Sequence, residues 1–591
     1  MEQNSIKGIP YGLSDYTRLA RENYYYVDKT HFIPLIEQEA SYLFLIRPRR
    51  FGKTLLINML AAYYDINNAD RFEELFGEQW IYEHPTSLRA KFMILRFNFS
   101  AVNSTPGRLE ESFEEHCTGR LVEFADKYEH LFQPGFRQEL MSRTTASTRL
   151  DYINSTASRL RLRIYLLIDE YDNFTNTILS TFGKDEYRKA THGEGFFRYF
   201  FNVLKFLTSG NDMALERMFI TGVSPITLDD VTSGFNIGTN ITTSPLFNGL
   251  VGFTETELRT MLEYYRDRGA LTMDVEEMIA DMKPWYDNYH FSKECLNESM
   301  YNSDMTLYYI NSCLKQGRKP EEMVDTNIRT DYNKLRHLIR IDHELDANFS
   351  VIREIVENGR TSGTISSAFS VEKMVNENNF KSLLYYFGLL SIRGVEEGET
   401  VLAIPNNTVR EQFYNYLTEA YADEDIFSLN ISTLGKLAKE MAYRADWQPL
   451  FTYIATELEK QSRIREFIDG EAHVKGFLLA YLNMTNFYQL MPEYELGKGY
   501  ADFYFRPNPQ IPDIRYAYLM EVKYLKRDDP ESRIATLKEE ARTQLLKYAS
   551  DEIVAQTIGG AQLKLITIVF RGWEIVGMEE TDKLFNEKRD S

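Results

Sequence analysis

Short apolar runs alternate with longer amphipathic stretches over the first 250 residues of the chain. The runs Tyr42–Ile46, Phe92–Asn98, Leu162–Ile168 and Arg217–Ser224 are each predicted to form a strand, because a strand that is buried on both faces reads as a nearly continuous apolar run. Helices are predicted at 55–64, 108–131, 148–160 and 196–207. This alternation predicts an α/β fold, with a parallel sheet covered by helices on both faces.

The pattern changes after residue 250, where amphipathic helices dominate as far as residue 461. Apolar residues recur at helical spacing in Glu255–Arg266, Asp274–Met282 and Ser432–Met441. No catalytic motif lies in this region, which therefore reads as a helical lid.

A helix followed by a hairpin is predicted inside the lid region. Leu383–Leu390 has the pattern of a helix, and residues 391–405 have the pattern of two short strands. This order is typical of a winged helix. The hairpin carries Glu396, Glu397 and Glu399, which favours a structural lid or a protein contact over DNA binding.

Strands return near the C-terminus. Glu493–Phe505 and Tyr516–Lys523 are predicted to form the two strands of a hairpin, and Leu563–Phe570 the final strand. A chain of 591 residues is long enough for several cores. We therefore expect three domains, at 1–250, 251–465 and 466–591.

A phosphate-binding loop is predicted after the first strand, in a sequence that ends in Gly52, Lys53 and Thr54. Backbone N–H groups bind phosphate where a strand passes through a loop into a helix. Lys53 is placed to reach the outer phosphates of ATP, and the Thr54 hydroxyl to ligate Mg²⁺. Arg47 stands in place of the first glycine of the usual motif. On this segment alone, an ordinary strand with a polar end therefore remains an alternative interpretation.

A second motif supports nucleotide binding. The strand Leu162–Ile168 ends in Asp169 and Glu170, which suits a pair in which the first acid lies beside Mg²⁺ and the second polarises the attacking water. The strand Arg217–Ser224 ends in hydroxyls, so Thr221 or Ser224 is a candidate sensor of the γ-phosphate. A strand-ending turn remains the alternative for the sensor.

Three polar side chains form a second candidate centre near the C-terminus. Glu521 and Lys523 project from one face of their strand, and the neighbouring strand can bring Asp502 opposite them. Paired carboxylates bind Mg²⁺, which can activate water against a phosphodiester, while the ammonium stabilises developing charge. The alternative is a surface hairpin held by salt bridges.

The N-terminal motifs resemble a bacterial AAA-ATPase-like family. The resemblance rests on Tyr25-Tyr-Val-Asp-Lys-Thr30 and Arg47-Pro-Arg-Arg-Phe-Gly-Lys-Thr54, and continues less tightly to Trp285-Tyr-Asp-Asn-Tyr289. It implies a P-loop NTPase domain in which Arg49 and Arg50, together with Arg47, contact phosphates. Asn288 stands where the family usually has glycine, and asparagine is well suited to a left-handed turn.

The C-terminal motif resembles the PD-(D/E)xK nuclease superfamily, through Asp502, Glu521 and Lys523 and through Gly497-Lys498-Gly499 before them. The resemblance implies a restriction-endonuclease-like α/β domain. Tyr500 departs from it, because the related subfamily commonly has arginine there. The accessory positions that it implies are Glu471, Glu493 and Gln544.

The net charge of −20 argues against a chain that coats nucleic acid through bulk electrostatics. Residues 471–591 carry only −3, so the other 470 residues carry −17. If nucleic acid binds, we therefore expect it at the C-terminal domain. The three cysteines have no CxxC spacing and the nine histidines no ligand spacing, so neither disulfides nor a zinc site is expected. The absence of an apolar signal segment or membrane span leads us to expect a cytoplasmic protein.

These features predict an ATPase that is coupled through the lid to a metal-dependent nuclease for DNA or RNA, with ATP and Mg²⁺ as cofactors. The family resemblance adds defence or mobile-element biology as a setting. The alternative is an ATP-dependent switch or assembly protein whose C-terminal fold only binds a partner. A homo-oligomer remains open.

Overall fold

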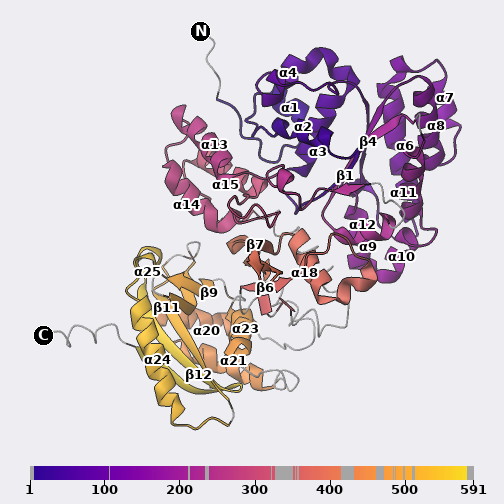
Figure 1. Ribbon diagram of the computed structural model, residues 1–591. Helices are drawn as coiled ribbons and strands as arrows, with labels where there is room; N and C mark the ends of the chain where they lie inside the picture. The colour runs from indigo at the N-terminus through magenta and orange to yellow at the C-terminus, as the bar shows by residue number, and fades with distance from the viewer. Residues whose placement is uncertain are drawn as a thin grey trace. The chain divides into compact units, whose positions relative to one another are not determined.

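The computed structural model describes residues 6–105, 107–210, 213–232, 238–320, 322–325, 351–352, 354–355, 359–410, 412–413, 431–460, 471–482, 485, 487–496, 499–508, 511, 513–526 and 528–581. The chain divides into two compact units, Met1–Arg410 and Glu411–Ser591 (Figure 1). Each unit is described by itself below.

A five-stranded parallel sheet forms the centre of the N-terminal unit. Its spatial order is β2 (Met93–Asn98), β3 (Ile164–Asp169), β4 (Leu215–Gly222), β1 (Tyr42–Ile46) and β5 (Thr239–Asn240). All six residues of β3 are buried, as expected for a parallel sheet with both faces covered. The candidate sensor strand β4 therefore lies between β1, which leads into the phosphate loop, and β3, which ends at the acidic pair.

Helices cover this sheet and confirm the predicted α/β architecture. Figure 1 shows α1 to α4 gathered on one side of β1 and β4, and α6 to α8 with α11 on the other. The helices of this part are α1 (Tyr16–Arg21), α2 (Ile33–Gln38), α3 (Lys53–Tyr64), α4 (Phe72–Phe76), α5 (Trp80–Glu83), α6 (Leu109–Lys127), α7 (Phe136–Met141), α8 (Ala146–Arg159), α9 (Asn173–Phe182), α10 (Lys184–Thr191), α11 (Phe196–Leu207) and α12 (Pro225–Thr232).

The lid region of the same unit has its own hydrophobic core. Helices α13 (Glu255–Asp267), α14 (Val275–Tyr286) and α15 (Ser303–Gln316) bury Leu258, Met278 and other apolar residues against one another. They present the apolar faces that the helical periodicity predicted.

The predicted winged-helix pattern is present at 371–403. A short 3-10 helix, η6 (Val371–Val375), leads into α18 (Glu377–Tyr386), and the hairpin of β7 (Ser391–Glu396) and β8 (Glu399–Ala403) follows. The earlier strand β6 (Arg360–Gly363) completes an antiparallel sheet of spatial order β6, β8, β7. The helix starts six residues before its predicted start at 383 because the Asn376 side chain caps it, accepting from the N–H groups of two following residues.

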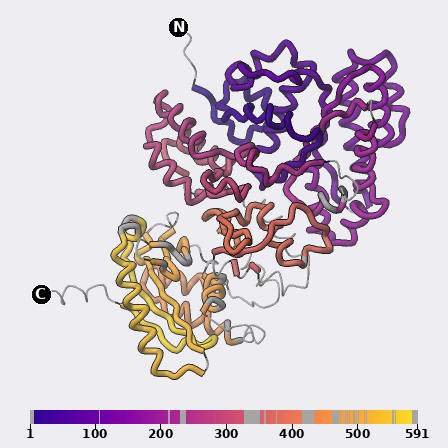
Figure 2. Tube along the Cα trace, viewed as in Figure 1, coloured from indigo at the N-terminus to yellow at the C-terminus, as the bar shows by residue number. Residues whose placement is uncertain are grey.

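The C-terminal unit is a mixed sheet with helices. Its spatial order is β13 (Glu574–Thr581), β12 (Gln562–Arg571), β11 (Tyr516–Leu525), β10 (Gly499–Pro507) and β9 (Tyr488–Leu496). In this sheet β11 and β12 are parallel neighbours, and the other neighbouring strands are antiparallel. Helix α24 (Arg533–Tyr548) lies between β11 and β12 in the sequence and packs on both strands. Figure 2 shows this part of the chain at the yellow end of the trace. The other helices are α20 (Ile431–Arg444), α21 (Gln448–Lys460), α23 (Glu471–Leu482) and α25 (Glu552–Thr557).

Two strand predictions in this unit are wrong. The predicted strand Glu493–Phe505 is divided between β9 and β10, which pair antiparallel with each other from Leu496 and Gly499 onwards. The chain also continues past the predicted final strand into β13, whose acidic sequence lacks a clear strand pattern.

The three-domain division stays a prediction. Helices α20 and α21, which the sequence placed in the lid, pack against β11 and β13. Tyr518 Oη donates to the carbonyl of Met441 (2.8 Å), and Trp447 Nε1 donates to the Glu580 carboxylate (3.0 Å). Among the described residues, no helix combines the length and the apolar character that a membrane crossing requires.

Candidate nucleotide and metal sites

The phosphate loop joins β1 to α3. Gly52 has φ +92°, a left-handed conformation that glycine adopts at little cost, and helix α3 begins at the next residue. Lys53 is 6% exposed, and its Nζ donates to the carbonyl oxygens of Arg47 (3.0 Å) and Pro48 (2.8 Å). Burial lowers the pKa of Lys53 to about 8, although Glu170 and Asp169 oppose this change. The Lys53 ammonium therefore contacts the backbone at the start of the phosphate loop.

Three side chains converge on Asp169 at the carboxyl end of β3. Thr54 Oγ1 donates to Asp169 Oδ2 (2.7 Å), and Thr221 Oγ1 donates to Asp169 Oδ1 (2.8 Å). Asn98 Nδ2 contacts Oδ2 at 3.4 Å. Asn98 was not among the predicted site residues, although it is the last residue of a predicted strand, and Asn98 and Asp169 are partners in the β2–β3 register.

Glu170 follows directly and has an unusual backbone. Its φ of +49° is uncommon for a residue other than glycine. Asn173 Nδ2 donates to its carboxylate (2.7 Å). Burial and the neighbouring Asp169 raise the pKa of Glu170, while Lys53 and Arg49 oppose the rise. Glu170 thus lines the same cavity as Lys53 and Arg49.

The two sensor candidates differ in position. Thr221 contacts Asp169, as described above. The Ser224 hydroxyl instead accepts from the backbone N–H of Ile226 (3.3 Å) at the start of α12. The backbone N–H groups of Val223 and Ser224 donate to the buried carboxylate of Asp172. Asp172 therefore ties the ends of β3 and β4 together, and Thr221 is the hydroxyl that faces the acidic pair.

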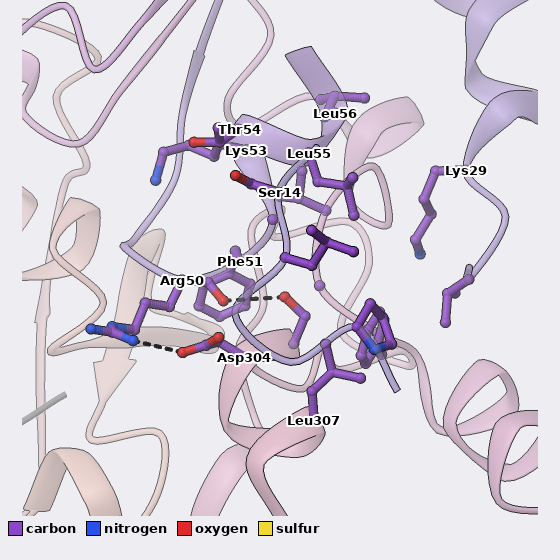
Figure 3. A pocket seen from close by; sticks show the side chains of 18 of the residues that line it. Ser14, Lys29, Arg50, Phe51, Lys53, Thr54, Leu55, Leu56, Asp304 and Leu307 are labelled. Atoms are coloured by element: carbon purple, nitrogen blue, oxygen red, sulfur yellow. Dashed lines mark hydrogen bonds and ion pairs between the residues drawn. The ribbon is translucent and has the colours of Figure 1, made fainter. Parts of the chain in front are cut away.

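The arginines of the loop take different positions. Arg47 is fully buried, with its guanidinium 4.2 Å from the centre of the Phe291 ring, and it donates to the carbonyls of Thr242 and Phe247. This differs from the phosphate contact that the resemblance implied for Arg47. Figure 3 shows Arg50 directed toward Asp304 of α15, at 2.7 Å. Arg49 lines the cavity and affects the pKa of both Lys53 and Glu170.

A cavity of about 350 Å³ extends from the phosphate loop toward α15 and the N-terminal segment (Figure 3). The loop residues 49–54 form its polar end together with Glu170. Its apolar wall includes Leu13, Val27, Val251 and Leu307. The lid and the N-terminal segment therefore complete a pocket that the phosphate loop begins.

The Tyr25–Thr30 signature holds the N-terminal segment in place. The Asp28 carboxylate accepts from the N–H of Thr30 (2.8 Å) and from the N–H of Trp80 (2.6 Å), where α5 begins. Lys29 Nζ lies 2.6 and 2.7 Å from the two carboxylate oxygens of Glu257 on α13. The signature thus connects the segment to the lid, and Glu257 is a partner that the sequence analysis did not name.

The C-terminal centre has the predicted strand geometry. Asp502 lies on β10, and Glu521 and Lys523 lie on the antiparallel neighbour β11, with Phe503 opposite Met520. The N–H of Val522 donates to Asp502 Oδ2 (2.8 Å), and Lys523 Nζ donates to Glu521 Oε2 (2.9 Å). The three side chains that the sequence singled out lie together.

Burial and neighbouring charges both act on the ionisable groups of this centre. Burial, followed by the Asp502 carboxylate, raises the pKa of Glu521 to about 8. Burial opposes protonation of Lys523, but Glu521 and Asp502 raise its pKa overall. A further cation, Lys475 of α23, lies 2.5 Å from Asp502 Oδ1 and 2.9 Å from Glu471. Lys475 could not be predicted from the sequence, because nothing in the linear pattern fixes how α23 packs over the sheet.

The accessory positions are only partly described. Glu471 begins α23 and reaches the site through Lys475. Gln544 lies on α24, and its buried Oε1 has no hydrogen-bond partner among the described residues. Residues 497–498 lie outside the described residues, as do the side chains of Glu493 and Tyr500.

Comparison with known proteins supports two separate domains. Residues 10–232 match the model of a family described as "Predicted AAA-ATPase", and residues 469–580 match that of the PD-(D/E)XK nuclease superfamily. A protein of Azotobacter chroococcum mcd 1, described as "Uncharacterized protein in vnfD 5'region", is 26% identical over 303 residues. That match covers 50% of this chain and 51% of the relative, so it spans about half the length of each. The chain thus carries an AAA-ATPase-like domain at 10–232 and a PD-(D/E)XK nuclease superfamily domain at 469–580.

Proposed function

We propose that this protein binds and hydrolyses ATP in its N-terminal unit and cleaves DNA or RNA with a divalent metal in its C-terminal unit. The observation that carries the nuclease proposal is the pair of buried carboxylates, Asp502 and Glu521, on facing strands beside Lys523. The family matches support both halves at the level of the domain.

The N-terminal residues fit ATP and Mg²⁺. The cavity volume of about 350 Å³ lies in the range of about 300–1,000 Å³ of small-molecule sites. Thr54 and Asp169 would hold Mg²⁺, which would neutralise phosphate charge.

The other residues of the cavity would act on the phosphates and on water. Phosphates would be bound by Lys53, Arg49 and Arg50, and Gly52 would allow the backbone to approach them closely. Thr221 would orient Asp169, and Glu170 would accept the proton of the attacking water.

The C-terminal residues fit a hard cation. Asp502 and Glu521 supply carboxylate oxygens. Burial and the neighbouring Asp502 raise the pKa of Glu521, and a positive charge between the two carboxylates would oppose both effects. A bound Mg²⁺ would supply an activated water and Lewis acidity. Lys523 would orient the nucleophile and stabilise charge on the phosphodiester.

One observation favours the alternative of a partner-binding module. The Lys475 ammonium already pairs with Asp502, so a positive charge can be supplied to this carboxylate by the protein itself. In that case ATP would control assembly or partner binding and no phosphodiester would be cut.

Cleavage assays separate the two functions. The full chain is incubated with a mixed DNA and RNA panel, with Mg²⁺ or Mn²⁺, with and without ATP. We expect cleavage that Asp502→Asn abolishes and that Asp528→Asn, a change at an exposed loop acid of the same unit, preserves. Absence of cleavage in every condition, or equal cleavage by both variants, would contradict the assigned nuclease site.

A further inference from the structure

Three side chains outside both candidate sites converge from separate elements of the N-terminal unit. His192 follows the last residue of α10, Asp230 lies on α12, and Glu372 lies on η6. His192 Nε2 is 3.5 Å from Asp230 Oδ1 and 3.5 Å from Glu372 Oε1. One nitrogen and two carboxylate oxygens therefore lie within 4.8 Å of one another.

The hydrogen bonds of Thr191 fix the tautomer of His192. The Thr191 hydroxyl donates its single hydrogen to the carbonyl of Tyr187 (2.9 Å), so the hydroxyl oxygen can only accept from His192 Nδ1, at 2.9 Å. The neutral imidazole therefore carries its hydrogen on Nδ1. Its Nε2 lone pair faces two carboxylates, an arrangement of acceptors that requires a cation or a proton between them.

Asp230 is held through its outer oxygen. Asp230 Oδ2 accepts from the Tyr187 hydroxyl (2.8 Å) and from the N–H of Val371 (3.3 Å), which leaves Oδ1 facing His192. Glu372 is oriented differently, because Arg188 Nε donates to Oε1 (3.0 Å), the same oxygen that faces His192. An imidazole and a carboxylate with hydrogen-bonded outer atoms, as in His192 and Asp230, are characteristic of metal ligands.

We propose that His192, Asp230 and Glu372 bind a divalent transition-metal cation of the Zn²⁺ class. An imidazole with two carboxylates suits Zn²⁺, Co²⁺ or Mn²⁺ better than Mg²⁺, which prefers an all-oxygen shell. Arg188 shares an oxygen of Glu372, so it would remain as an outer neighbour of the ion. Nothing in the sequence pattern pointed to this site, because its ligands are separated by 38 and 142 residues.

A cation at this site would link two elements of the N-terminal unit, α12 and η6. Helix α12 begins at Pro225, shortly after Thr221, whose hydroxyl contacts Asp169. Glu372 lies on η6, which leads into α18 of the winged-helix segment. A bound cation would fasten the helix that follows the sensor strand to the winged-helix segment, so that a shift of one is transmitted to the other.

The test uses the full chain with Asp502→Ala and Glu521→Ala, which removes the carboxylates of the proposed C-terminal metal centre; the proposed Mg²⁺ site at Thr54 and Asp169 lacks its phosphate ligands because no nucleotide is added. After dialysis against a chelator, Zn²⁺ is titrated calorimetrically without nucleotide, and the bound metal is counted by elemental analysis. We expect one equivalent of Zn²⁺, with affinity at least about tenfold lower in His192→Gln and in Glu372→Gln. His130→Gln, at an exposed histidine, is the matched control and should bind like the background protein.

Substitution with Co²⁺ provides an independent readout, since the visible absorption of Co²⁺ reports nitrogen ligation. This absorption should weaken in His192→Gln and persist in His130→Gln. Circular dichroism checks that each variant is folded. Glu372 is exposed, and glutamine keeps the shape of its side chain, so Glu372→Gln still tests metal binding if His192→Gln unfolds. No Zn²⁺ binding by the background protein, or equal affinity in Glu372→Gln and His130→Gln, would overturn the proposal.

Discussion

The Thr54 hydroxyl donates a 2.7 Å hydrogen bond to Asp169, a residue 115 positions further along the chain. The two residues are separated in the sheet by β4, so the first turn of α3 meets the end of β3 across the strand that carries Thr221. This arrangement places a hydroxyl, a carboxylate and a sensor hydroxyl around one point.

The affinity for ATP should fall as the pH rises through about 8. Burial lowers the pKa of Lys53 to about 8, so the ammonium that would bind phosphates loses its proton above this pH. Affinity should decrease up to about tenfold per pH unit beyond that point, because only the protonated form binds phosphates well. Calorimetry between pH 7 and 9.5 measures this slope.

Lys53→Arg is the control for this titration, since a guanidinium keeps its charge over the whole range. The variant should bind ATP more weakly than the wild type at neutral pH, but without the slope above pH 8. The same slope in both proteins would mean that another group titrates.

Metal affinity at the C-terminal centre should show the opposite trend. Burial and Asp502 raise the pKa of Glu521 to about 8. Below this pH a cation must displace a proton from the carboxyl group, so affinity for Mn²⁺ should rise up to about tenfold per pH unit until about pH 8 and then level off. Titration of Mn²⁺ by electron paramagnetic resonance at pH 6, 7 and 8.5 gives the profile, in a chain that carries His192→Gln and Glu372→Gln so that the proposed site at those residues does not contribute.

A Glu521→Gln protein tests the assignment of that profile. It should bind Mn²⁺ weakly and nearly independently of pH. A steep rise that persists in Glu521→Gln would assign the proton to a different group, and the raised pKa of Glu521 would then have no part in metal binding.

Much of this architecture could be predicted from local pattern. The bounds of β1 and α11 follow from runs of apolar residues, and the meeting of Asp502 with Glu521 follows from strand alternation. Contacts made by docking of distant elements could not be predicted. Lys475 reaches Asp502 only because α23 packs on the sheet, and Arg47 is enclosed by carbonyls from residues 242 and 247.

The Lys29–Glu257 pair should be important for stability. Lys29 is buried, and replacing Glu257 by glutamine would remove the carboxylate that pairs directly with its ammonium. We expect Glu257→Gln to lower the free energy of unfolding of the N-terminal unit by about 3 kcal/mol. Chemical denaturation followed by tryptophan fluorescence measures the change.

An exposed ion pair of the same lid provides the comparison. Lys283 and Glu255 are 2.8 Å apart but largely exposed, so Lys283→Gln should cost no more than about 1 kcal/mol. The double variant Lys29→Met with Glu257→Leu should recover part of the loss, because no buried charge remains. Equal losses for the buried and the exposed pair would contradict the structural role given to the signature.

The two centres should be energetically coupled if ATP controls the nuclease. Glu170→Gln retains Lys53, Thr54 and Asp169 for binding but removes the group proposed to activate water, so ATP should persist and hold the bound conformation. In the Glu170→Gln protein, nuclease rates should therefore differ between saturating ATP and no ATP. The direction of the change distinguishes activation from restraint.

Reciprocity makes this coupling measurable without cleavage. A nucleic acid that binds the C-terminal unit must shift ATP affinity by the same factor by which ATP shifts nucleic-acid affinity, a factor of about 5 to 150 for ordinary coupling energies. The measurement titrates ATP into Glu170→Gln combined with Asp502→Asn, with and without saturating nucleic acid. Identical ATP affinities, together with nuclease rates that ignore ATP in Glu170→Gln, would establish two independent enzymes on one chain. A shift of ATP affinity without any cleavage by the wild type would instead favour the nucleotide-controlled binding module.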